Sequence, residues 1–194
     1  MKAILRNNLE RKINLTDSEF ELFFEYFDIL SYNKKEHLVN SGRICNYYYF
    51  VTKGLLRGYY IDENAKEHIT SFAIENWWIT DLDSFFEKRP AQLNIQALEQ
   101  TTVLAISFDK LNQAFEEIPK LNKFFRIQMQ NMVMAIQRRH DFYMKKDGKK
   151  RYELLIECLP DFVQRIPQYM LASYLDLTPE YLSDLRKSPK HIFS

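Results

Sequence analysis

The chain has 194 residues, and its 27 Lys and Arg against 26 Asp and Glu give a formal net charge of +1. This balance excludes nucleic-acid binding through bulk charge, although a local basic patch would still allow it. Hydrophobic residues make up 46% of the chain and aromatic residues 15%, which is enough to bury a core and excludes global disorder. The longest apolar runs are far shorter than the roughly 20 residues of a membrane span, and the N-terminus has no signal-peptide core. We therefore expect a cytoplasmic protein with no membrane contact.

Residues that could carry metal or catalytic chemistry are few. Cys45 and Cys158 stand alone, which excludes a disulfide framework or a cysteine-ligated cluster. The histidines are scattered along the chain at His37, His68, His140 and His191. One alternative is that His68 points into a barrel as a metal or haem ligand. There is no Gly-rich phosphate loop and no Ser-His-Asp arrangement, so we expect no cofactor, no metal and no enzyme activity.

The first half of the chain predicts one helix followed by strands. Thr16 and Glu19 form a capping box, and phenylalanines at spacings of three and four extend an amphipathic helix to about residue 29. Between residues 30 and 107 no helical period survives. Short β-branched and aromatic runs predict a hairpin of strands 55–61 and 68–72 and a second pair of strands, 95–97 and 103–106. Such spacing is typical of a sandwich or barrel.

A long helix follows residue 107. After a short apolar face at residues 108–115, Pro119 restarts the helix, because proline suits a first helical turn. A heptad seam then runs for nearly thirty residues, with Arg139 as its polar exception, and its dimer-forming members are Phe125, Met129, Met132, Ile136 and Tyr143. The alternative is a helix packed on its own sheet. At 1.5 Å per residue, however, the helix measures about 40 Å and would overrun a small domain, so we favour dimerisation.

The segment from Gln168 to Lys187 predicts a helix-turn-helix. Ala172 provides the small residue at the helix crossing, and Asp176 stands in the turn where a positive φ is needed. Pro167 suits the opening of the first helix, and Thr178 with Pro179 suits the N-cap and first position of the second. Apolar positions between the helices are filled by leucines: Leu171, Leu175, Leu177, Leu182 and Leu185.

In such a motif the second helix enters the major groove of DNA. The expected contacts of this helix are Thr178, Pro179, Glu180, Tyr181, Ser183, Asp184, Arg186 and Lys187. A basic run lies before the motif, where Gly148 marks the expected end of the long helix. This run adds candidate phosphate contacts at Lys149, Lys150 and Arg151. The alternative for this run is an ordinary solvated surface.

These patterns together predict an α+β protein with three parts. Residues 1–118 form an N-terminal β jelly roll with flanking helices, the sensor domain. Residues 119–147 form the long dimerisation helix and a hinge. Residues 148–194 form a C-terminal, all-α helix-turn-helix domain.

The whole chain resembles the Crp/Fnr superfamily of bacterial transcription regulators, in its short Bacteroidetes-like branch. The resemblance rests on Tyr49-Phe50-Val51 with Lys53-Gly54, on Glu75-Asn76-Trp77-Trp78-Ile79, on Gln96-Ala97-Leu98-Glu99, and on the helix-turn-helix residues. It implies a cyclic-nucleotide-binding-like jelly roll, a homodimer, double-stranded DNA as a partner and a small-molecule effector whose identity is unknown.

The resemblance also locates a candidate effector pocket. Nucleotide-binding members carry a Gly-Glu pair where Thr80-Asp81 stands here, and an arginine for the cyclic phosphate where Ala91-Gln92 stands. Without that arginine the phosphate loses its bidentate partner, so we expect no gating by cyclic AMP. The tentative pocket comprises Trp77, Trp78, Thr80, Asp81, Phe85, Ala91 and Gln92. The simpler interpretation of the two tryptophans is that they are core and sheet-surface residues.

Two departures from the family concern DNA reading. Asp184 stands where family members usually have a guanine-reading arginine, and the sequence ends at Ser194, which leaves no room for a two-stranded wing. We therefore expect a dimeric DNA-binding regulator. The alternative is a dimeric ligand-sensing or interaction protein whose degenerate helix-turn-helix no longer reads DNA specifically.

Overall fold

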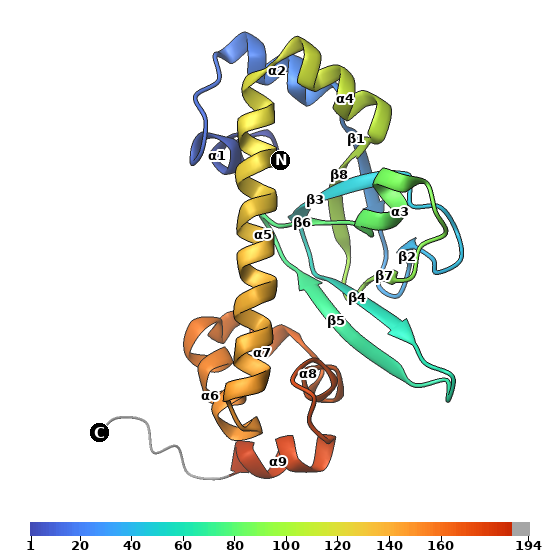
Figure 1. The fold of residues 1–194 in the computed structure, drawn as a ribbon, viewed down its shortest axis with the longest axis vertical. Coiled ribbons are helices and arrows are strands. Elements are labelled where there is room, and N and C mark those ends of the chain that lie inside the picture. The colour runs from blue at the N-terminus through green and yellow to red at the C-terminus, as the bar shows by residue number, and fades with distance from the viewer. Residues whose placement is uncertain (188–194) are drawn as a thin grey trace. The chain divides into compact units, whose positions relative to one another are not determined.

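The computed structural model of the chain describes residues 1–187 (Figure 1). The chain divides into two units. The first comprises Met1–Tyr60 and Thr70–Met132, and the second comprises Ile61–Ile69 and everything from Val133 onward. His191 and the C-terminal part of the predicted 148–194 domain, including the place of a wing, lie outside the described residues.

The N-terminal β domain is a jelly roll, as the sequence predicts. Within residues 1–187 its strands form two four-stranded sheets, ordered β1-β8-β3-β6 and β2-β7-β4-β5. The strands are β1 (Asp28–Tyr32), β2 (His37–Val39), β3 (Tyr47–Lys53), β4 (Leu56–Ile61), β5 (Glu67–Ala73), β6 (Trp78–Ile79), β7 (Asn94–Ala97) and β8 (Thr101–Ser107). The neighbours β4 and β5 confirm the predicted hairpin.

The first helices of the chain pack on the first sheet, and the last helices belong to the second unit. They are α1 (Lys2–Glu10), α2 (Asp17–Glu25), α3 (Leu82–Glu87), α4 (Phe108–Glu117), α5 (Lys120–Lys145), α6 (Gly148–Cys158), α7 (Pro160–Arg165), α8 (Gln168–Tyr174) and α9 (Pro179–Lys187). The capping box of α2 forms as predicted, since the Thr16 hydroxyl accepts from the Glu19 N–H and the Glu19 carboxylate accepts from the Thr16 N–H. The fold class is therefore α+β, with a long helix α5 and an all-α C-terminal part.

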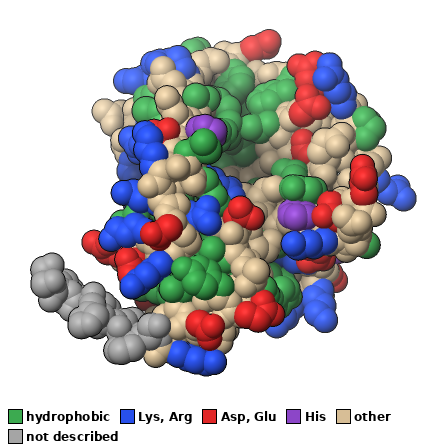
Figure 2. All heavy atoms as spheres, turned by 60° about the horizontal axis from the view of Figure 1, so that its bottom comes forward, with side chains coloured by type: hydrophobic (Ala, Val, Ile, Leu, Met, Phe, Trp, Pro, Cys, Tyr) green, Lys and Arg blue, Asp and Glu red, His purple; other side chains and the backbone are tan. Residues whose placement is uncertain are grey.

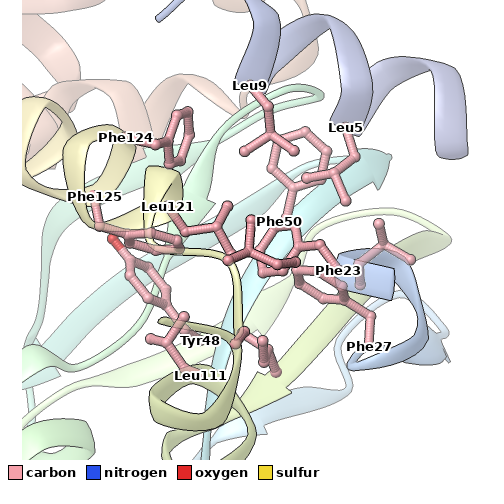
Figure 3. Close-up of a cluster of buried hydrophobic side chains, with 14 of the residues drawn as sticks. Leu5, Leu9, Phe23, Phe27, Tyr48, Phe50, Leu111, Leu121, Phe124 and Phe125 are labelled. Atoms are coloured by element: carbon pink, nitrogen blue, oxygen red, sulfur yellow. The ribbon is translucent and has the colours of Figure 1, made fainter. Parts of the chain in front are cut away.

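Strands β3 and β8 of the first sheet are buried on both faces, because α1, α2, α4 and the start of α5 cover the side that faces away from the roll. Alternate residues of β3 serve two different cores: Tyr48 and Phe50 pack among the helices, whereas Tyr49 and Val51 point into the roll. This explains why β3 reads as a continuous apolar run. Figure 3 shows the helix-side core, where Phe50 lies among Leu5, Leu9 and Phe23.

Three sequence expectations about this unit are wrong. Helix α2 ends at Glu25 and not near residue 29, because the chain enters strand β1 at Asp28. The stretch from 30 to 107 is not free of helix, since α3 lies within it. Strands β7 and β8 do not pair: β7 joins β2 and β4 in one sheet, whereas β8 joins β1 and β3 in the other. The turn after Ala97 therefore carries the chain from one sheet to the other.

Helix α5 is unbroken over 26 residues and starts directly after Pro119. Gly148, which the sequence places at the end of this helix, instead opens α6, with Asp147 as its N-cap. A Cβ at Gly148 would lie 2.4 Å from a methyl carbon of Leu177. A glycine at this position therefore allows the start of α6 to approach the turn that precedes α9.

Candidate nucleic-acid interface and sensor site

The helix-turn-helix forms as the sequence predicts. Helices α8 and α9 are joined by a turn in which Asp176 has a φ of +54°. Ala172 is fully buried at the crossing, and the Leu177 N–H donates to its carbonyl oxygen at 2.9 Å. Thr178 caps α9, since its hydroxyl accepts from the Tyr181 N–H at 3.2 Å. These local bonds fix the angle at which α9 leaves the turn.

One face of α9 is open to solvent, as a recognition helix requires. The residues predicted to contact DNA are exposed except for Ser183, which is half-buried: Thr178, Pro179, Glu180, Tyr181, Asp184, Arg186 and Lys187. Leu182 is fully buried on the opposite side and holds the helix to its domain. Figure 2 turns this end of the molecule toward the viewer and shows acidic and basic side chains interspersed.

The charges near α9 are partly paired. Lys187 lies 3.9 Å from Asp184 one turn earlier, with both side chains more than three-quarters exposed. Lys149 and Lys150 at the start of α6 are exposed and lie 4.0 Å and 3.5 Å from Glu153. Exposed pairs of this kind are weak, so these lysines keep most of their freedom to reach a phosphate.

Arg151 differs from the two lysines beside it. It is half-buried, and its guanidinium lies over the Tyr143 ring at 4.9 Å. One of its terminal nitrogens donates to the Asp176 carbonyl at 3.4 Å. The structure therefore directs this predicted phosphate contact toward the interior of the C-terminal unit.

The exposed apolar face of α5 includes Ile136 of the predicted seam, but its other members lie to one side of that seam. Phe125 is 7% exposed within the helix-side core, and the Tyr143 hydroxyl donates to the Tyr174 carbonyl. Both ends of the predicted seam are thus used inside one chain, and Met129 and Met132 are half-buried. Ile136 and Val133 are each 61% exposed, and the apolar face that they share continues to Met144. At 100° per residue this face is rotated by roughly 60° from the predicted seam.

The tryptophans of the tentative effector pocket occupy different places. Trp78 packs in the helix-side core, and its indole N–H donates to the Asn8 side-chain oxygen at 3.1 Å. Phe85 is fully buried in the same core. Trp77 is 43% exposed. Trp78 thus occupies a core position, as the simpler interpretation of the two tryptophans expects, and Phe85 lies in the same core.

The other four pocket residues surround α3. Asp81 is only 5% exposed and caps this helix by accepting from the Ser84 N–H at 3.1 Å. Its second carboxylate oxygen accepts from the backbone N–H groups of Gln92 and Leu93, at 2.9 Å and 3.1 Å. Thr80 is the neighbour of Asp81, and its hydroxyl donates to the Tyr47 carbonyl at 2.9 Å. Ala91 is buried in the core of the roll, whereas the Gln92 side chain is exposed.

The tip of the β4–β5 hairpin belongs to the same unit as the helix-turn-helix. There the Ile69 N–H donates to the Ser173 hydroxyl on α8 at 3.1 Å. His68 lies at this tip and contacts the Asp62 carboxylate at 2.7 Å, which lowers the pKa of Asp62. His68 therefore turns to a carboxylate of its own hairpin. The sequence does not predict the Ser173 contact, because a lone serine on a helix gives no signal of a partner more than a hundred residues away.

Within residues 1–187 no group of three or more His, Cys, Asp or Glu side chains is arranged to hold a metal ion. None of the helices in that range combines the length and the hydropathy that crossing a membrane requires.

Comparison with known protein families gives a match in the N-terminal part of the chain. Residues 29–117 match the cyclic nucleotide-binding domain family. The cAMP-activated global transcriptional regulators CRP of Salmonella typhimurium and Klebsiella aerogenes are 27% identical over 106 residues, which cover 55% of this chain. The aligned part spans half the length of these relatives.

Solved structures extend the likeness to most of the chain. The c-di-GMP responsive global regulator CLP of Xanthomonas campestris has a TM-score of 0.72 at 14% identity, covering 89% of this chain and 90% of that one. FixK2 of Bradyrhizobium japonicum has a TM-score of 0.69 at 16% identity, covering 82% of each chain. A CooA mutant of Carboxydothermus hydrogenoformans has a TM-score of 0.64 at 20% identity, covering 84% of this chain and 76% of that one. Residues 29–117 thus match the cyclic nucleotide-binding domain family, and the chain as a whole shares its fold with these solved structures.

Proposed function

We propose that this protein is a dimeric, DNA-binding transcription regulator of the short, Bacteroidetes-like Crp/Fnr branch, and that it is not an enzyme. The observation that carries the proposal is the complete helix-turn-helix, with its buried crossing at Ala172, its left-handed turn at Asp176 and the open face of α9. The relatives that comparison returns are regulators by name, and a protein that reads genomic DNA would act in the cytoplasm.

The proposed role of each α9 side chain in DNA binding follows from its position on the helix. Glu180 and Tyr181, in the first turn, are exposed where base edges are reached, and a glutamate accepts a hydrogen bond from a cytosine amino group. Arg186 and Lys187, in the last turn, would neutralise phosphates. Lys149 and Lys150 add two exposed cations at the start of α6.

Dimerisation would use the exposed apolar face of α5. Val133, Ile136 and Met144 are large apolar side chains that leave much of their surface to water within one chain. A second copy of the same helix would bury them in an isologous contact, as two-fold symmetric recognition of DNA requires.

Gating by cyclic AMP is not part of the proposal. Apart from the missing arginine at Ala91-Gln92, the buried Asp81 carboxylate already accepts from the N–H groups of Gln92 and Leu93. A phosphate brought to those donors would meet a negative charge at close range in a region of low dielectric. An effector of the roll is therefore expected to be something other than a cyclic nucleotide phosphate.

The test is binding of the purified protein to genomic fragments, including its own upstream region, over a salt series with competitor DNA. Binding to a two-fold symmetric site that survives competitor supports the proposal. In that assay Arg186→Ala should weaken binding to all sequences and reduce the salt slope by about one. Glu180→Ala is the matched variant, which should relax specificity at one base pair and leave the slope unchanged.

A second candidate function rests on Asp184. This side chain places a negative charge on the open face of α9 and holds Lys187 at 3.9 Å. Under this alternative the protein is a dimeric ligand-sensing or interaction protein whose helix-turn-helix no longer reads DNA. Weak, sequence-blind binding of the wild type that disappears near physiological salt would favour it, and Asp184→Ala should then bind DNA more tightly than the wild type.

A further inference from the structure

Arg151 links three elements of the C-terminal unit. It stands in the first turn of α6, where its neighbours Lys149 and Lys150 are exposed. Its guanidinium covers the Tyr143 ring near the end of α5, and one nitrogen donates to the Asp176 carbonyl between α8 and α9. Arginine suits this double role because its flat, delocalised group stacks on an aromatic face while its edge donates hydrogen bonds.

The turn that Arg151 reaches is a strained one. Asp176 holds a φ of +54°, a conformation that L side chains seldom adopt and that persists only where the surroundings enforce it. Local bonds supply part of that enforcement, from the Asp176 N–H to the Ser173 carbonyl at 3.2 Å and from the Leu177 N–H to the Ala172 carbonyl at 2.9 Å. The Arg151 bond to the Asp176 carbonyl adds a restraint from outside the motif.

The other end of the link is anchored in α5. The Tyr143 hydroxyl donates to the Tyr174 carbonyl at the end of α8. Arg139, one turn earlier, lies over the Tyr143 ring at 5.4 Å and over the Tyr174 ring at 4.5 Å. Tyr143 therefore donates a hydrogen bond to α8 through its hydroxyl, while its ring stacks against the Arg151 guanidinium.

We propose that Arg151 is a positioning residue, which fixes the helix-turn-helix to the end of α5 and does not contact a phosphate. The proposal rests on the proposed function, because its consequence is that the position of α5 sets the direction of the recognition helix α9. In this arrangement the dimer helix and the DNA-reading element move as one body through Tyr143, Arg151 and the Asp176 turn.

Hydrogen–deuterium exchange of the full-length protein tests the link without DNA. In Arg151→Gln the amides of Asp176 and Leu177 should exchange about three- to ten-fold faster, the factor that corresponds to one lost hydrogen bond. Lys150→Gln is the matched control, because it removes a charge from the same helix turn at a side chain that is half exposed. Equal exchange at these amides in Arg151→Gln and Lys150→Gln would overturn the proposal.

A milder variant covers the case in which Arg151→Gln does not fold. Tyr143→Phe keeps the ring beneath Arg151 and removes only the hydroxyl that reaches Tyr174. Exchange at the amides of Asp176 and Leu177 should again become faster than in wild type. Exchange as slow as in wild type would mean that α5 is not coupled to the turn.

DNA binding then separates a positioning role from a phosphate contact. Arg151→Gln should weaken binding about three- to ten-fold at one salt concentration without changing the salt slope, whereas loss of a phosphate contact lowers that slope by about one. Arg151→Lys should fail to restore affinity, because lysine keeps the charge but loses the stacking fork. A reduced slope in Arg151→Gln, or full rescue by lysine, refutes the inference. If wild type binds no DNA, the proposed function fails, and the exchange data still decide whether Arg151 holds the turn.

Discussion

Replacement of Asp81 with alanine tests how the α3 segment is held on the roll. The buried carboxylate accepts three backbone hydrogen bonds, from the N–H groups of Ser84, Gln92 and Leu93. Loss of an N-cap side chain costs typically about 1 kcal/mol. Each of the other two N–H groups loses a bond to a charged acceptor worth about 1.5 kcal/mol or less, since Gln92 is exposed and water can replace part of it. The free energy of unfolding should therefore fall by about 2–4 kcal/mol.

The measurement is guanidinium unfolding of the full-length protein followed by tryptophan fluorescence. Both tryptophans, Trp77 and Trp78, lie in the N-terminal unit, so the signal reports on the roll. Asp83→Ala is the matched control, because Asp83 stands in the first turn of the same helix with a side chain that is 54% exposed, 3.6 Å from Arg89. This exposed pair should contribute less than about 0.5 kcal/mol.

The difference in unfolding free energy between the two variants shows whether the hydrogen bonds of Asp81 stabilise the α3 segment. If Asp81→Ala loses no more stability than Asp83→Ala, the three hydrogen bonds do not hold the segment together. The case for a roll whose anion-binding donors are already occupied by its own carboxylate would then be withdrawn.

Three further predictions concern the dimer helix, the turns and pH. Val133→Asp should shift the proposed dimer to monomer in sedimentation experiments, because it places a charge in the exposed apolar face of α5. Asn131→Asp, on the opposite side of the helix, should leave the sedimentation unchanged, and a dimeric Val133→Asp protein would contradict dimerisation through this face. The free energy of unfolding of Gly54→Ala should fall by about 2–4 kcal/mol in the fluorescence assay, because φ is +104° and a Cβ would lie 2.7 Å from the Cα of Thr101. Gly42→Ala, with φ of +82° and open space around it, should lose only about 1 kcal/mol, and equal losses in the two variants would refute the steric argument. The Lys120 ammonium and the Thr16 N–H lower the pKa of Glu19 in the folded state, so the unfolded state binds more protons. The resulting stabilisation is present above about pH 5 and is lost as the pH falls through the folded pKa. The denaturant midpoint of unfolding should therefore drop in acid below that pH, and it should drop less steeply in Glu19→Gln.

The helix-turn-helix could be predicted from the sequence because its determinants are local. Pro167, Ala172, Asp176 and Thr178 each act within four residues of themselves, through a fixed φ, a close crossing, a positive φ and a cap. Such signals do not depend on what the rest of the chain does. For the same reason the strand β4 and its partner β5 were found, since both flank a short turn.

The pairing of strands and the short helix could not be predicted in the same way. Sequence neighbours such as β7 and β8 belong to different sheets, and nothing within their few residues records which distant strand will lie beside them. Helix α3 spans six residues, too few for a period to show. Its signals are its two ends, the cap at Asp81 and the left-handed Lys88 with φ of +57°, and neither residue type is specific for that role.

The direction in which a charged or apolar side chain points is the last thing that the sequence leaves open, and here it changes the functional assignment. Lys149, Lys150 and Arg151 form one basic run, yet only Arg151 turns inward, because Tyr143 and the Asp176 carbonyl lie on its side of α6. The heptad count on α5 meets the same limit. It includes Phe125, which is buried in the helix-side core, and the apolar face that stays exposed is therefore the one that contains Val133. A periodic pattern shows that a helix has an apolar side, but only the packing of its two ends shows how much of that side remains for a partner.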